Sequence, residues 1–151
     1  MKRIAFLSLT FLVLFGSPVF SQNTYDFLRV DMSARAAALG GSFVSNNDDV
    51  DVIFYNPAGL ESLTSSPVSF SFVKYLMDIN LASLSFSTRY EDIGRFGAAV
   101  KYINYGSFDE TDMDGKTIGT FNANELALIV GYANKLDQNF FYGANVKFIY
   151  C

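Results

Sequence analysis

The sequence predicts an all-β protein, an up-and-down antiparallel sheet of the kind that forms a transmembrane β-barrel. Apolar and polar residues alternate strictly through 81–90 and again after a short turn at 91–95, and this period of two sends successive side chains to opposite faces of a strand. The even-numbered face carries the large apolar residues, whereas the odd-numbered face is small and mildly polar, which reverses the contrast of a soluble sheet. Each strand is about ten residues long, enough to cross a membrane at a tilt.

The composition of the chain limits the classes of function that we expect for it. The 151-residue chain has a net charge of −4, no His and one Cys, Cys151. The acidic balance leaves no electrostatic footprint for nucleic acid. Without His, and with a single Cys, most routes to nucleophilic catalysis and to a transition-metal site are closed. We therefore expect no enzyme, no cofactor and no metal. Sixteen Phe and nine Tyr in so short a chain favour β structure.

The first 21 residues predict a secretory signal peptide. Lys2 and Arg3 form a charged start, the run 4–15 is apolar, and Pro18 breaks it before small residues. We expect cleavage after Ser21. The apolar run is shorter than the roughly twenty residues of a transmembrane helix. The sequence thus predicts export from the cytoplasm.

Residues 22–67 do not alternate and predict a separate N-terminal segment. Asp31 or Ser33 can cap a short helix over 34–39, which Gly40 and Gly41 end. Residues 50–55 are predicted as a short strand. Asn56 followed by Pro57 suits either a helix start or a turn.

From residue 68 to 151 the pattern predicts five strands in up-and-down order. After 68–72 and the two arms of the 81–105 hairpin, we expect a long polar loop over 106–120, then strands around 125–132 and 141–150. The connections near 91–95 and 134–139 are short, and outer-membrane barrels have short periplasmic turns and longer external loops. With the mature N-terminus in the periplasm, the long connection lies outside. Aromatic residues near strand ends suit an interfacial girdle: Tyr75, Tyr90, Tyr105, Phe121, Tyr132, Phe140 and Tyr150.

Five strands cannot close a membrane barrel. Such a barrel needs about eight strands, because an open edge in lipid leaves backbone groups unpaired. Either several chains share one barrel, or residues 1–151 are the N-terminal part of a longer protein, which we favour.

Two motifs give the chain a family resemblance. Residues 33–41, Ser-Ala-Arg-Ala-Ala-Ala-Leu-Gly-Gly, precede residues 55–60, Tyr-Asn-Pro-Ala-Gly-Leu, and alternating strands follow. Over 22–150 the chain resembles the PorV/PorQ family, within the FadL-like group of outer-membrane barrels. The resemblance implies a barrel of about fourteen strands, with the N-terminal segment inside it as a plug. It makes Arg35, Asn56, Pro57 and Gly59 candidate plug or binding residues.

The resemblance also implies a function in the cell outer membrane. PorV and PorQ act in type IX secretion, which carries folded cargo proteins to the cell surface, whereas FadL passes hydrophobic solutes. We expect a role in secretion or surface attachment, with outer-membrane lipid, secretion-system components and exported cargo as partners. A FadL-like solute channel is the alternative.

Charged residues in the strands test this interpretation. Arg89, Lys101, Glu125 and Lys147 all lie on the odd-numbered face. If that face is the lumen, they can pair across strands or with the plug, whereas a basic residue facing lipid costs about 2–4 kcal/mol near the midplane. Arg35 is the expected partner of one of the carboxylates in 48–51.

Three other interpretations stay open. Residues 109–115 echo the start of a calcium-binding loop, but Phe121 stands where the bidentate Glu belongs, so a solvated loop is favoured. A soluble secreted β-barrel carrier would bury the even-numbered face as its core. A surface adhesin without transport is the third.

Overall fold

The computed structural model describes residues 25–46, 48–91 and 93–151. The predicted signal peptide and its cleavage site lie outside these residues. The elements in chain order are η1 (Asp26–Arg29), α2 (Ala34–Ala38), η2 (Val50–Phe54), η3 (Pro57–Ser62), β1 (Val68–Lys74), β2 (Asn80–Tyr90), β3 (Gly94–Thr111), β4 (Thr117–Asp137) and β5 (Phe140–Tyr150), where η marks a 3-10 helix.

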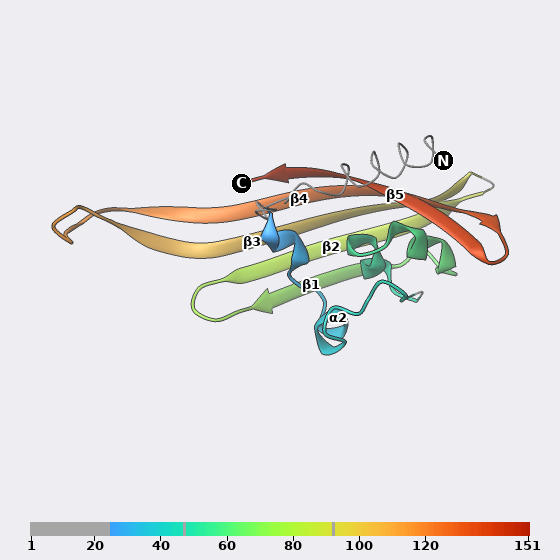
Figure 1. Cartoon of the computed structure of the whole chain (residues 1–151), viewed down its shortest axis with the longest axis horizontal. Helices are drawn as coiled ribbons and strands as arrows, with labels where there is room; N and C mark the ends of the chain where they lie inside the picture. The colour runs from blue at the N-terminus through green and yellow to red at the C-terminus, as the bar shows by residue number, and fades with distance from the viewer. Residues whose placement is uncertain (1–24, 47, 92) are drawn as a thin grey trace, which may run out of the picture.

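The five strands form one antiparallel sheet in which each strand pairs with the next along the chain, in the order β1-β2-β3-β4-β5 (Figure 1). This confirms the predicted all-β, up-and-down architecture. The pairing of Leu84 with Val100, and of Val100 with Leu128, keeps the even-numbered positions of three strands on one face. The alternation read from the sequence therefore continues across the sheet.

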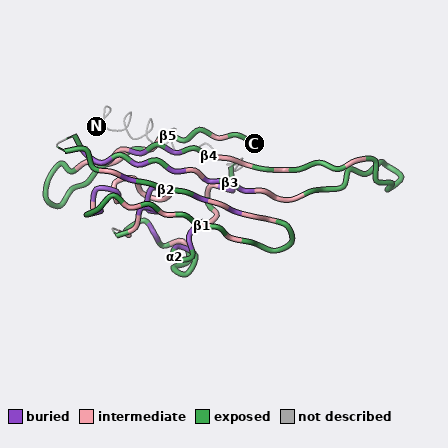
Figure 2. Tube along the Cα trace, turned by 180° about the vertical axis from the view of Figure 1, so that it is seen from behind, coloured by how far each residue is buried: buried purple, intermediate pink, exposed green. Residues whose placement is uncertain are grey.

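The two faces of the sheet have opposite environments. Residues 25–66, called here the plug segment, pack on the odd-numbered face, where Ser83, Ser85, Ala99, Lys101 and Ile129 are buried. The even-numbered face is open, and its large apolar residues are exposed. Figure 2 shows buried stretches concentrated where the plug segment meets the strands. The exposed apolar residues on the even face include Phe70, Phe72, Leu84, Phe86, Phe96, Leu128, Val130, Val146 and Phe148.

The plug segment is built from short helical turns. Ser33 caps α2, as predicted, because its Oγ accepts a hydrogen bond of 3.1 Å from the amide of Ala36. Asn56 starts η3 in the same way, with Pro57 in its first turn, which favours the helix start over the simple turn. The predicted strand over 50–55 is wrong. It is the 3-10 helix η2, begun by the side chain of Asp49.

The predicted long loop over 106–120 is also wrong. β3 continues to Thr111 and β4 begins at Thr117, so only a five-residue turn separates them. An irregularity in the pairing at Tyr105 and Gly106 interrupts the alternation, and this break, together with the polar residues beyond it, is typical of a loop. Tyr105, expected in the aromatic girdle, instead packs beside buried residues of the covered face.

The turns at the two ends of the sheet differ in length. At one end, β2–β3 and β4–β5 are joined by 91–93 and 138–139, and at the other end the links are 75–79 and 112–116. In the part of the chain that the structure describes, no helix is long and apolar enough to span a membrane.

Candidate functional site

The candidate site is the contact between the plug segment and the covered face of the sheet. Two apolar clusters form it. One joins Phe43, Ile53 and Leu60 of the plug segment to Ala99 and Ile129 of the sheet. The other joins Phe27 and Met32 to strand residues near the opposite end, Leu81, Ile103 and Ala127. All of these side chains are at most 5% exposed, so the plug segment excludes water from these two stretches of the covered face.

Two strand glycines let the plug segment approach the sheet closely. A Cβ added at Gly143 would lie 2.6 Å from the amide nitrogen of Ala58. A Cβ at Gly97 would lie 2.9 Å from the terminal carbons of Ile53 and Leu60. Since atoms at these distances overlap, a larger residue at Gly143 would push η3 away from β5. At Gly97 it would force the ends of the Ile53 and Leu60 side chains to shift.

Lys101 of β3 holds the start of the plug segment. Its Nζ donates hydrogen bonds of 3.0 Å to the carbonyl oxygen of Leu28 and 2.6 Å to that of Val30. The residue is 1% exposed, and a buried ammonium needs such acceptors to replace water. Lys101 thus binds the main chain of the plug segment rather than a particular side chain.

Arg95 and Asn145 act on the other end of the plug segment in the same way. The Arg95 guanidinium donates to the carbonyl oxygens of Leu63 and of Ser65, the second at 2.6 Å. The Asn145 amide donates to the carbonyl oxygen of Ile53 at 2.6 Å. Together with Lys101, these side chains bind plug carbonyls from residue 28 to residue 65.

Asp51 is a buried carboxylate between η2 and the first two strands. It accepts hydrogen bonds from the hydroxyls of Ser85 at 2.6 Å and Ser69 at 3.0 Å. Burial raises the pKa of Asp51, and these two hydrogen bonds offset part of that rise. The carboxylate ties η2 to β1 and β2 at once.

Arg35 pairs with carboxylates of its own segment, as predicted. Its guanidinium lies 3.0 Å from Asp48 and 3.6 Å from Asp49, and the hydrogen bond and charge of Asp48 raise the pKa of Arg35. Nearby, the Tyr55 hydroxyl donates to Asp31 at 2.6 Å. Burial, then Asp31, raises the pKa of Tyr55. These contacts fold residues 31–55 back on themselves, and Arg35 stays half exposed.

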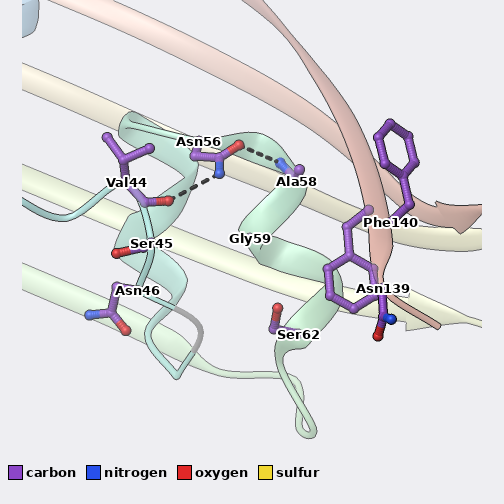
Figure 3. Close-up of a pocket in the computed structure, with 10 residues that line it drawn as sticks. Val44, Ser45, Asn46, Asn56, Ala58, Gly59, Ser62, Asn139 and Phe140 are labelled. Atoms are coloured by element: carbon purple, nitrogen blue, oxygen red, sulfur yellow. Dashed lines mark hydrogen bonds between the residues drawn. The ribbon is translucent and has the colours of Figure 1, made fainter. Parts of the chain in front are cut away.

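Asn56, Pro57 and Gly59 shape the η3 start beside an open pocket. The Asn56 side chain accepts from the amide of Ala58 and donates to the carbonyl of Val44 at 3.0 Å (Figure 3). A Cβ at Gly59 would lie 2.7 Å from Val52. The pocket, of about 350 Å³, is uncharged and lies between the plug segment and the β4–β5 turn, with Phe140 on its far side. Asn56 and Gly59 therefore meet at one site, and Arg35 lies apart from it.

The remaining candidate charges lie on the covered side of the sheet to different degrees. Arg89 pairs with Glu61 at 2.5 Å, and Glu125 accepts a hydrogen bond of 2.5 Å from the Tyr105 hydroxyl. Lys147 is exposed. The sequence did not single out Arg95 and Asn145, and it offered Asp51 only as a possible partner of Arg35, which instead pairs with Asp48 and Asp49. The odd number of Arg95 and Asn145 in alternating strands was the available signal for the first two.

One family model matches the chain, that of the type IX secretion system protein PorV, over residues 20–150. The chain belongs to this family. The match confirms the resemblance to PorV and PorQ, and it identifies the chain as a type IX secretion-associated protein. Searches of curated proteins and of solved structures gave no match.

Proposed function

We propose that this PorV-family chain is an outer-membrane component of type IX secretion that helps carry cargo proteins to the cell surface or attach them there. The observation that carries the proposal is the contrast between the faces of the sheet. One face is open and apolar, and the other holds buried Lys101 and Arg95 beneath the plug segment. Lipid suits the first face and a barrel lumen suits the second.

The energetics of the charged residues support this orientation. A basic side chain facing lipid near the midplane costs about 2–4 kcal/mol, and Lys101 instead donates to two carbonyls on the covered face. The apolar face presents Phe86, Val130 and Phe148, each between 41% and 63% exposed. Burying such side chains in lipid removes their apolar surface from water, which is favourable. On a surface that faces water, the same side chains would stay exposed.

The turns support a direction across the membrane. The two- and three-residue links at 138–139 and 91–93 share one end of the sheet, and short turns are periplasmic in outer-membrane barrels. The opposite end, with the turns at 75–79 and 112–116, then faces outward. In this direction η2 and η3 lie toward the periplasm, and residues 28–30 lie toward the outside.

The plug segment suggests a role in binding and gating rather than in catalysis. Side chains of β3 and β5 bind its main-chain carbonyls, and Gly143 allows its backbone to approach β5 closely. In a complete barrel of FadL type, with about fourteen strands, such a segment would block passage through the lumen. Cargo and other secretion components are then the partners, and they would meet the barrel at its surfaces.

A hydrophobic-solute channel is the second candidate. A cavity of about 170 Å³ lies between the plug segment and the sheet, lined by Val30, Tyr75, Ile79, Leu81, Ile103 and Tyr105. Its lining is apolar, which favours an apolar ligand. Its volume is below the 300 Å³ or more of typical ligand pockets, so this candidate ranks second. The soluble carrier is disfavoured, because it needs the even-numbered face as its core.

The experiment compares a deletion strain with strains that carry the full-length gene. Separated membranes are run on detergent gels with and without boiling, and exported cargo is counted on the cell surface. In the strains that carry the gene, we expect a heat-shifted band in the outer membrane. We expect loss of surface cargo only in the deletion strain. Surface cargo at the wild-type level in the deletion would overturn the secretion role. Loss of long-chain fatty acid uptake instead would favour the channel.

A further inference from the structure

The hairpin of β3 and β4 extends well beyond the β1–β2 hairpin. Pairing of β2 with β3 ends at Asn80 and Asn104, and pairing of β4 with β5 ends at Leu126 and Tyr150. β3 and β4 nevertheless stay paired as far as Thr111 and Thr117. Residues 105–124, called here the β3–β4 ribbon, thus extend past the end of β2, and the β3 edge of the ribbon has no neighbouring strand within the described residues. Figure 1 shows this ribbon projecting past the β1–β2 hairpin.

A bulge exchanges the faces of β3 at the base of the ribbon. Asn104 pairs with Asn124, and the next recorded pair is Ser107 with Asn122, so β3 holds one extra residue there. Gly106 accommodates it with a φ of +85°. Because a strand alternates with a period of two, one extra residue sends even-numbered side chains to the opposite face. Phe108 therefore lies on the side of the sheet that carries the plug segment.

Because the faces of β3 are exchanged after the bulge, two exposed aromatic side chains come together. Phe108 stacks on Phe121 with ring centroids 5.4 Å apart and planes at 24°, and the two residues are 43% and 53% exposed. Exposed apolar side chains that cluster on a surface mark interaction sites. Without the bulge, Phe108 would face the other side and no pair would form.

The charge of the ribbon indicates the kind of partner. The ribbon and its turn carry four carboxylates, Asp109, Glu110, Asp112 and Asp114, against one base, Lys116. In the described part of the chain no group of acidic residues is arranged to hold a metal ion. Carboxylates also disfavour burial in lipid. A positively charged protein surface complements both the carboxylates and, through its aliphatic stems, the aromatic pair.

We propose that the β3–β4 ribbon is a docking surface for a lysine- or arginine-rich segment of a partner protein. The segment lies across Phe108 and Phe121, and its bases pair with the carboxylates of the ribbon. The location of this contact on the outer side of the membrane rests on the proposed function. The ribbon geometry, the exposed pair and the charge do not depend on it.

The test places a photo-crosslinking phenylalanine analogue at position 108 of the full-length protein in native membranes. The expected result is an adduct with another protein through a peptide rich in Lys and Arg. Neutralising the ribbon by Asp109→Asn, Glu110→Gln, Asp112→Asn and Asp114→Asn should lower the adduct yield about tenfold. A control that neutralises two exposed carboxylates outside the ribbon, Asp26→Asn with Asp137→Asn, should retain it.

The outcomes separate this proposal from the proposed function. Adducts confined to the same chain, no adduct, or a yield unchanged by neutralisation would each overturn the docking surface. A heat-shifted outer-membrane band in those same samples would show that the barrel had assembled and that the ribbon proposal alone had failed. Absence of that band in the wild type would overturn the barrel itself.

Discussion

Lys101 of β3 donates a hydrogen bond of 2.6 Å to the carbonyl oxygen of Val30, a residue 71 positions earlier in the chain. This contact joins the two parts of the molecule, because the ammonium belongs to the strand and the carbonyl belongs to the plug segment. The odd-numbered face carries the base, and the plug segment satisfies it.

The Lys101→Met variant should loosen the start of the plug segment and leave the sheet intact. Removing the donor leaves the carbonyls of Leu28 and Val30 unpaired, which costs about 1–3 kcal/mol. Amide hydrogen exchange over 25–32 should therefore accelerate about tenfold or more, while exchange in β2 and β3 stays unchanged. Lys147→Met, on the same face but exposed, is the matched control. Equal exchange over 25–32 in both variants would refute the anchoring role.

Gly143→Ala should destabilise the contact between η3 and β5. The new Cβ would meet main-chain atoms of Pro57 and Ala58 at 2.7 and 2.6 Å, which cannot move away independently. Overpacking of this kind costs about 1–3 kcal/mol. Gly119→Ala is the control, because its Cβ would meet only the flexible Glu110 side chain, 3.1 Å away. Denaturant unfolding in lipid vesicles measures both, and a Gly143→Ala effect no larger than that of the control would contradict the close contact.

Asp51 should give the protein a measurable pH dependence. Burial raises the folded-state pKa above the unfolded value of 3.8, so the folded protein binds more protons between the two values. The free energy of unfolding should therefore fall as pH rises from about 4 through the raised pKa. Asp51→Asn should flatten this slope, and Asp109→Asn, at an exposed position, should not. Identical slopes in the wild type and Asp51→Asn would show that the carboxylate is not the source.

Val130→Arg should block assembly of the protein into membranes. Val130 is 53% exposed on the apolar face, and an arginine facing lipid near the midplane costs about 2–4 kcal/mol. Val130→Leu keeps the apolar character and should assemble normally. The heat-shifted band on a detergent gel reports assembly. A normal yield of this band from Val130→Arg would place that face in water.

The sequence predicts the sheet well because each strand carries its own signal. Alternation at Leu84, Phe86 and Phe96 depends only on the period of two, and it assigns faces without knowledge of the neighbours. At the bulge beside Gly106 the alternation no longer predicts the faces correctly, because one extra residue shifts the period. The 3-10 helix η2 was missed for a different reason. Val50, Val52 and Ile53 are all buried, so their apolar run resembles a strand.

The site was less predictable than the sheet. Arg35 and its carboxylates lie within one local loop, and simple charge pairing anticipates them. Arg95 and Asn145 bind main-chain carbonyls of residues 53–65. Because every residue has a main-chain carbonyl, the sequence does not show which ones act as acceptors. Their role emerges only when strands and plug segment are placed together.

The most direct test of the account is lipid quenching of single tryptophans at two adjacent positions of β5. The chain contains no Trp, so Phe148→Trp and Lys147→Trp each report one face. In vesicles with brominated acyl chains, we expect strong quenching of the tryptophan at position 148 and little at position 147. Equal quenching at both positions, or stronger quenching at position 147, would contradict the assignment of the even-numbered face to lipid.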